Sequence, residues 1–168
     1  MKFLPLLLLS ILLTSCAGYK LGGAKPSHLD HVNNIYVPLF VNDTLLIRAD
    51  SHATNSAVDA ITRDGTYRIT SASKADAILK GTVSNIDFDQ VSSSRTDSIH
   101  SEELSMTITI SWVLQDAQNP TRILQKGKSS GATRFFAQGN LSVARTNALP
   151  DALRRATEAM TTRIADGF

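Results

Sequence analysis

The clearest pattern of hydrophobic and polar positions runs from Leu104 to Gln115. Apolar side chains occupy every second position, and Ser, Thr or Gln fill the positions between them, apart from Val113. Successive side chains of a strand point to opposite faces of a sheet, so this segment is predicted to be a strand with one buried face. The predicted buried side chains are Leu104, Met106, Ile108, Ile110, Trp112 and Leu114.

A second alternation precedes this strand and changes its parity. The apolar positions are odd between Ala77 and Val83, but even at Ile86 and Phe88. A β-bulge near Ser84–Asn85 would keep both sets of side chains facing the core. Residues 91–103 have no apolar period, so we expect them to form the exposed tip of a long hairpin.

Two amphipathic helices are also predicted. The first lies between the turn and cap residues Asn42–Thr44 and the stop signal Asp64–Gly65. The second runs from about Leu141 to Ala165, and Pro150 either kinks it or divides it in two. The expected buried positions are Ile47, Ala53, Ala57, Val58 and Ile61 in the first helix, and Leu149, Ala152, Leu153, Ala156, Met160 and Ile164 in the second.

Three further strands are predicted from their residue types. Ile35–Val41 contains Pro38, which favours a strand at an edge or with a bulge. Tyr67–Thr70 is a short strand, and Arg122–Phe136 is a longer one weakened by two glycines. The order of elements is strand, helix, three or four strands, helix, and it predicts an α+β fold with two helices packed on one face of a mainly antiparallel sheet. It forms a single domain over residues 34–168.

The N-terminus has the pattern of a secretory signal. Lys2 precedes an apolar run from Phe3 to Leu13, too short to span a membrane, for which about 20 residues are needed. Leu13-Thr14-Ser15-Cys16 resembles a bacterial lipobox, in which the thiol of the cysteine takes a diacylglycerol. We therefore expect a signal peptide over residues 1–15 and a lipidated lead over 16–33.

The alternative is an ordinary signal with a chance cysteine. Lipidation at Cys16 would attach diacylglycerol and palmitate, and stable anchoring needs more than one chain. Ala17 follows the cysteine, where an aspartate would suggest retention in the inner membrane. The expected location is the periplasmic side of the cell outer membrane.

Candidate catalytic groups are sparse, and no enzyme is predicted. His28 and His31 are three apart but have no further ligand nearby, whereas a structural metal site usually has four. Neither a nucleophile elbow nor a phosphate-binding loop is present in the sequence. Nothing indicates that Asp87 and Asp89 are buried, as acid–base work would require. We expect no metal, no cofactor and no nucleic-acid partner; the formal charge is +2.

Four basic residues share even positions in the segment after Asn119-Pro120. With period 2 they would project from one sheet face, beside the Ser and Thr side chains of the preceding strand. Such a face could hold phosphates or sugars through charge-assisted hydrogen bonds. The alternative is a solvated face that keeps the sheet soluble. The four residues are Arg122, Lys126, Lys128 and Arg134.

Several stretches resemble the LPS-assembly lipoproteins of the LptE type. They are Gly18 to Gly23 with Lys25-Pro26, Ile35 to Thr44 (IYVPLFVNDT), Asp64 to Ile69 (DGTYRI), Ala75 to Val83 (ADAILKGTV) and Gly131 to Phe136. The resemblance implies two helices on a four-stranded sheet. It also implies a plug inside an LptD-type outer-membrane β-barrel, a role in assembling that barrel, and contact with lipopolysaccharide (LPS).

Two other classes of function remain open from the residues. One is an accessory lipoprotein of another envelope machine, such as a CsgG-like secretion subunit or a synthase activator. The other is a periplasmic enzyme, which would need clustered titratable groups with perturbed pKa values in a cleft.

Overall fold

A computed structural model of the chain describes residues 25–92, 103–137 and 139–167. The predicted signal peptide, Cys16 and most of the hairpin tip lie outside the described residues. In chain order the elements are η2 (Ser27–Leu29), β1 (Asn34–Tyr36), β2 (Val41–Asn42), α2 (Ala49–Asp64), β3 (Arg68–Ile69), η3 (Ala72–Lys74), β4 (Ala77–Ser92), β5 (Glu103–Asp116), β6 (Ile123–Phe136) and α3 (Leu141–Asp166).

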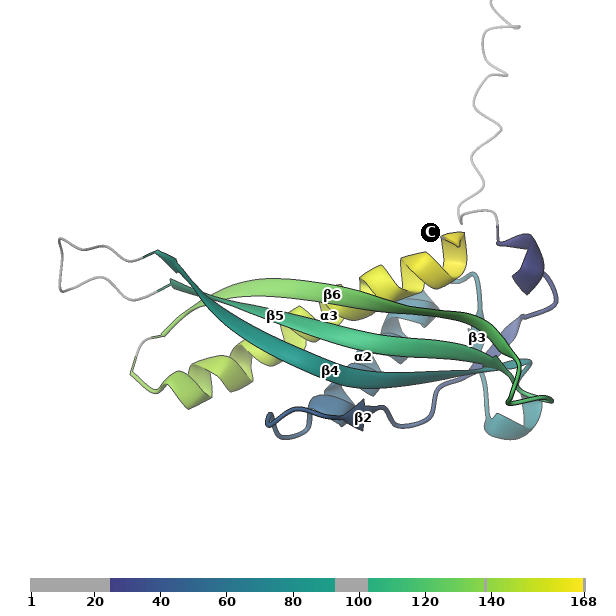
Figure 1. Cartoon of the computed structure of the whole chain (residues 1–168), viewed down its shortest axis with the longest axis horizontal. Helices are drawn as coiled ribbons and strands as arrows, with labels where there is room; N and C mark the ends of the chain where they lie inside the picture. The colour runs from purple at the N-terminus through teal and green to yellow at the C-terminus, as the bar shows by residue number, and fades with distance from the viewer. Residues whose placement is uncertain (1–24, 93–102, 138, 168) are drawn as a thin grey trace, which may run out of the picture.

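A long antiparallel meander of β4, β5 and β6 forms most of the sheet (Figure 1). The predicted alternation of β5 is confirmed. Met106, Ile108, Ile110 and Leu114 are fully buried, and Trp112 is 2% exposed. Because one face of the central strand is occupied by these side chains, all three strands of the meander share one inner and one outer face.

The predicted bulge in β4 is also confirmed. The register of β4 against β5 shifts between Val83 and Asn85. Beyond the shift, Ile86 and Phe88 are half-buried and pack against the core. One extra residue therefore keeps the apolar side chains of a 16-residue strand on the same face.

The sheet contains more strands than predicted, because the segment around Pro38 is broken. The structure has β1 before this proline and β2 after it, in place of one strand over Ile35–Val41. Both pair in parallel with β4, and β1 also pairs in parallel with β3. The α+β class is confirmed, but the sheet is mixed and has six strands, and β1 lies inside it rather than at an edge.

The first helix, α2, begins later than predicted. Asn42 does not cap it; its side-chain oxygen accepts hydrogen bonds from the amide and hydroxyl of Thr44 and closes a turn. Ile47 lies outside the helix and is 85% exposed, so its predicted burial is wrong. The predicted stop is confirmed, since Gly65 has a φ of 79° and its amide donates to the carbonyl of Ile61.

The second helix, α3, continues through Pro150 as a single element of 26 residues. Of the two alternatives left open by the sequence, a kink or a division, the division into two helices is excluded. The side chain of Asn140 caps it by accepting from the amides of Ser142 and Val143. The predicted inner face is confirmed: Leu149, Ala152, Leu153, Ala156, Met160 and Ile164 are all buried.

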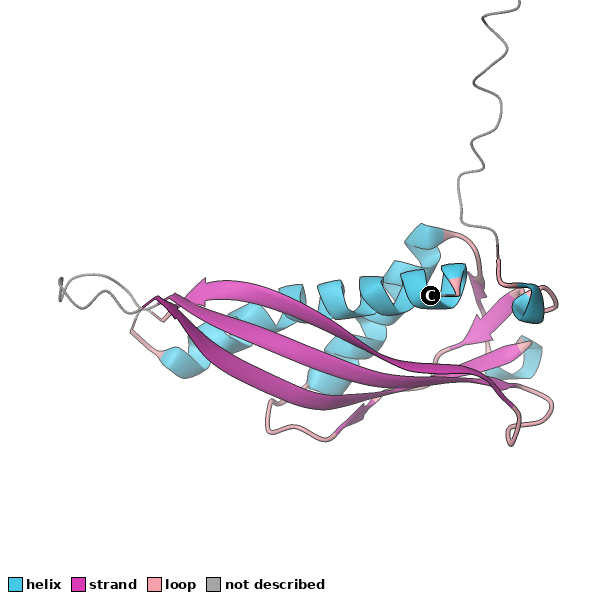
Figure 2. Ribbon diagram, turned by 45° about the horizontal axis from the view of Figure 1, so that its top comes forward, coloured by secondary structure: helices cyan, strands magenta, loops and turns pink. Residues whose placement is uncertain are grey.

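Both helices lie on the inner face of the sheet, and the outer face of the meander carries no helix (Figure 2). At Gly131 the contact between α3 and β6 leaves no room for a side chain. A methyl group there would overlap the carbonyl oxygen of Ala152 and the amide nitrogen of Ala156. The helix backbone therefore rests directly on the strand. Among the described residues, no helix is long and apolar enough to cross a membrane.

Replacing Gly131 by Ala should destabilise the domain by about 1–3 kcal/mol, because α3 must move away from β6 to admit the methyl group. The free energy of unfolding measured by urea titration checks this. Ala132→Ser, at the neighbouring exposed position, should change it by less than about 0.5 kcal/mol. Equal stabilities of the two variants would contradict the close contact.

Candidate functional site

The outer face of the meander is lined by hydroxyl groups. On β5 the outward side chains include Ser105, Thr107, Thr109 and Ser111, all half-buried. The hydroxyl of Thr109 lies 3.0 Å from that of Ser130 on β6. Since no described helix covers this face, these groups are available to a polar ligand.

Three of the four predicted basic residues project from this outer face. Lys126, Lys128 and Arg134 are exposed on β6, and their register against β5 runs without a shift. Arg122 does not belong to the set. It precedes β6, beyond a register shift, and its guanidinium lies 3.6 Å from the carboxylate of Asp116.

Arg134 lies apart from the two lysines. It is six residues beyond Lys128, or about 20 Å along a strand. Its guanidinium is 3.7 Å from the carboxylate of Glu103 at the start of β5. The predicted set of four therefore separates into two ion-paired arginines at the ends of the strand and two lysines between them.

A third lysine, Lys80 on β4, joins these two. The register places Lys80 beside Val113 and Val113 beside Lys126. One step along, Thr82, Ser111 and Lys128 form a second row of the same kind. We call Lys80, Lys126 and Lys128 the lysine cluster. Within the described part of the chain, no carboxylate pairs with any of the three.

The lysine cluster borders an open hollow of about 480 Å³. Val113 and Ser111 lie in its centre, and Gly127 lies beside them with the ring of Trp112 beneath. Trp112 itself is fixed by a hydrogen bond of 3.1 Å from its indole nitrogen to the hydroxyl of Ser129. Three ammonium groups around hydroxyls on a rigid floor can bind a phosphorylated or sulfated ligand.

Lys80 was missed at the sequence level because β4 was considered only for its apolar positions. Lys80 occupies an outward position of the alternation from Ala77 to Val83, so its face could have been predicted. Its proximity to Lys126 depends on the pairing of β4 with β5 and of β5 with β6. Strand register across two hairpins is not contained in the local pattern.

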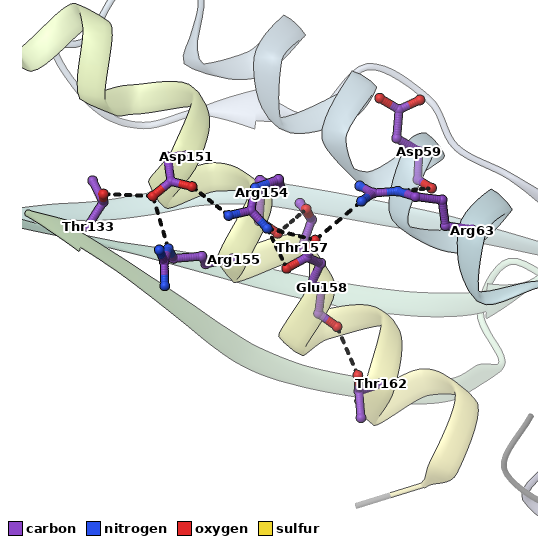
Figure 3. A network of polar contacts seen from close by, with 9 residues as sticks. All are labelled: Asp59, Arg63, Thr133, Asp151, Arg154, Arg155, Thr157, Glu158 and Thr162. Atoms are coloured by element: carbon purple, nitrogen blue, oxygen red, sulfur yellow. Dashed lines mark hydrogen bonds and ion pairs between the residues drawn. The ribbon is translucent and has the colours of Figure 1, made fainter.

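A separate polar network ties α3 to β6 and α2 (Figure 3). The carboxylate of Asp151 accepts hydrogen bonds from Thr133 at 2.7 Å, from Arg154 at 2.6 Å and from Arg155 at 3.0 Å. Arg154 also binds both oxygens of Glu158. The hydrogen bonds from Thr133 and the two guanidiniums hold the pKa of Asp151 well below its usual range. This network joins α3 to β6 and α2. It does not face the hollow bordered by the lysine cluster.

No catalytic arrangement accompanies these features in the described ranges. They contain no group of three or more His, Cys, Asp or Glu side chains that could hold a metal ion. The shifted pKa of Asp76 has a structural cause. Burial alone would raise it, but hydrogen bonds from Asn33 and Asn34 outweigh burial and lower it, joining β1 to the start of β4.

The fold is that of small α+β domains found among bacterial lipoproteins. The structure matches a minor lipoprotein from Acinetobacter baumannii (TM-score 0.53, 8% identity, 82% of this chain and 95% of that chain). It also matches lipoprotein B from Nitrosomonas europaea (0.50, 17%, 88% and 90%) and a protein from Xanthomonas campestris (0.54, 14%, 80% and 83%). At these identities the likeness concerns the fold alone. A comparison with the curated proteins finds no match.

The family is shown by the sequence itself. The model of the LptE family, described as lipopolysaccharide-assembly, matches residues 32–166. The chain therefore belongs to the LptE family of LPS-assembly lipoproteins, whose members are assembly factors and not enzymes. The resemblance identified from the short motifs is confirmed over nearly the whole described domain.

Asp151→Asn should lower the free energy of unfolding by about 1 kcal/mol near pH 7, a modest value because the network is partly exposed. A carboxylate with a lowered pKa stabilises the fold above its unfolded pKa of about 3.9 and loses that contribution as pH falls. The difference in free energy of unfolding between wild type and Asp151→Asn should therefore be largest above about pH 5 and decrease below about pH 4. Urea titrations across this range measure it.

The matched control for this variant is Asp59→Asn, on the exposed side of α2. The side chain of Asp59 makes none of the ion pairs of the network in Figure 3. Its stability difference from wild type near pH 7 should be small. A pH-independent difference for Asp151→Asn would show that the network does not depend on the charge of Asp151.

Proposed function

We propose that this protein is a lipid-anchored assembly factor of LPS export that binds the phosphates of LPS on the outer face of its meander. It acts inside an LptD-type β-barrel as a plug, on the periplasmic side of the cell outer membrane. Family membership supports the assembly role. That membership and the predicted lipid anchor also support the proposed barrel partner and location.

The lysine cluster is the observation that carries the proposed contact with LPS. Neighbouring strands lie about 4.8 Å apart, so Lys80 and Lys126 are about 10 Å apart at the backbone, and Lys126 and Lys128 about 7 Å. Like charges this close repel one another unless an anion neutralises them. Lipid A carries phosphates, and the hydroxyl of Thr82 can donate to the same oxygens.

The lipidated lead, residues 16–33, joins the folded domain through contacts of Lys25. The ammonium of Lys25 donates to the carbonyl of Val32 at 2.7 Å and lies 4.9 Å from the centre of the Tyr67 ring. This point lies near the C-terminus of α3, at the end of the molecule opposite the β4–β5 hairpin (Figure 1). From Cys16 to Lys25 the chain can span at most about 30 Å. A lipid on Cys16 would thus keep this end of the domain close to the membrane.

Replacing Lys126 and Lys128 together by Ser should weaken binding to purified LPS about tenfold at low salt. Two exposed ion pairs contribute roughly 0.7 kcal/mol each, and 1.4 kcal/mol is a factor of ten. Wild-type binding should weaken from 0.1 M to 1 M salt, as the screening length falls from about 10 Å to about 3 Å. Both changes can be measured by titration of the folded proteins.

A charge-matched control removes two cations from elsewhere on the surface. Arg68 and Lys74 are exposed on β3 and η3, and their replacement by Ser changes the net charge by the same amount. This variant should bind LPS as wild type does. Equal loss of LPS binding in both double variants would show that only the net charge matters. Binding of LPS by Lys126→Ser/Lys128→Ser as tight as by wild type would refute the site.

Cys16→Ala should leave the precursor unprocessed or displaced from the outer membrane, because the thiol that receives the lipid is absent. Fractionation of envelopes and the mass of the mature chain report this. A variant of normal mature mass that still fractionates with the outer membrane would overturn the predicted anchor.

A further inference from the structure

We infer that the free edge of β6, together with the groove between β6 and α3, binds an extended peptide segment of another protein as an added strand. The segment would alternate acidic and apolar side chains. This surface adjoins the lysine-bordered hollow at Lys128, but its backbone edge and its groove lie outside the hollow, and the inference does not depend on LPS binding.

The first observation is the direction of the backbone groups of β6. The carbonyl oxygen of Lys128 accepts a hydrogen bond of 2.7 Å from Arg163 on α3, so it points away from β5. Backbone groups alternate along a strand, and the register of β6 shows no shift from Gln125 to Phe136. The amides and carbonyls of Ser130, Ala132 and Arg134 therefore also point outward, where an added strand can pair with them.

The second observation is a groove of about 550 Å³ directly beneath this edge. Its walls are the end of β6, including Thr133 and Phe135, and the first half of α3. Val143 on α3 is 53% exposed and Phe136 at the end of β6 is 59% exposed. A strand beside a helix, with a groove between them, is the arrangement by which peptide-binding domains take up an extended ligand.

The two faces of the added strand would meet different surroundings. Its inward side chains would enter the groove, where Phe135 and Val143 favour apolar residues. The groove is also lined by the polar side chains of Asn140, Asn147 and Asp151. Its outward side chains would lie beside Lys128 and Arg134, within the 4.5–5.5 Å of a cross-strand pair, which favours acidic residues. The charge of this edge thus specifies the chemistry of the occupant.

A second copy of the chain does not meet these requirements. Antiparallel pairing of two β6 strands centred on Ser130 would put Lys126 opposite Arg134 of the second copy, which is repulsive. The edge of β4 in a second copy has the required alternation of apolar and acidic side chains at Ile86–Asp89. Its apolar side chains already face the core of that copy, so they cannot enter the groove. The ring of Phe88 lies 4.1 Å from the guanidinium of Arg145. An extended segment from a partner protein is the remaining occupant.

The test uses the full chain in detergent and an array of blocked heptapeptides in which Leu, Val or Phe alternates with Asp or Glu. Bound peptides should slow hydrogen exchange at the amides of Ser130, Ala132 and Arg134. The amides of Gly131 and Thr133 are already bonded to β5 and should not change. Replacing the acidic residues of a binding peptide by Lys should weaken binding several-fold.

Two variants separate the edge from the groove. Ala132→Pro removes an outward amide, which an edge strand tolerates, and should abolish binding; Ala132→Ser keeps the amide and should bind normally. Val143→Asp should also abolish binding, whereas Val41→Asp, at another exposed apolar position, should not. Binding by none of the peptides, wild-type binding by folded Ala132→Pro, or self-association through β6 would each overturn the inference.

Discussion

Contact between α3 and the inner face of β5 and β6 determines which side of the sheet stays open. The helix backbone reaches the strand at Gly131, and its buried side chains meet the apolar row of β5. With that face closed, the outward positions of the meander are covered by no described helix (Figure 2). The row of hydroxyls, the lysine cluster and the free edge of β6 all follow from this single packing arrangement.

Elements with a strong period could be predicted from the sequence, and those set by tertiary contacts could not. The alternation of β5 and the bulge of β4 were correct, because side-chain period directly reports burial. The start of α2 was wrong: Asn42 can serve a turn as well as a helix cap, and only the surrounding contacts decide between them. One strand was predicted across Pro38, at an edge or with a bulge. The break into β1 and β2, and the parallel pairing of both with β4, depend on residues far away in sequence.

The candidate site was partly predictable for the same reason. Parity alone placed Lys126 and Lys128 on one face of β6. It could not show that Arg122 lies beyond a register shift, nor that Lys80 comes from two strands away. The groove below the edge of β6 involves α3, so no local pattern indicates it. Sites built by one strand are visible in a sequence, whereas sites built across strands need the register.

Photo-crosslinking can show whether the outer face of the meander receives LPS. A photoreactive amino acid at Val113, between Lys80 and Lys126, should crosslink to LPS in intact envelopes. The same group at Asn55, exposed on α2 on the other side of the molecule, should not. Crosslinks to LPS from position 55 and none from position 113 would show that LPS does not bind the outer face of the meander.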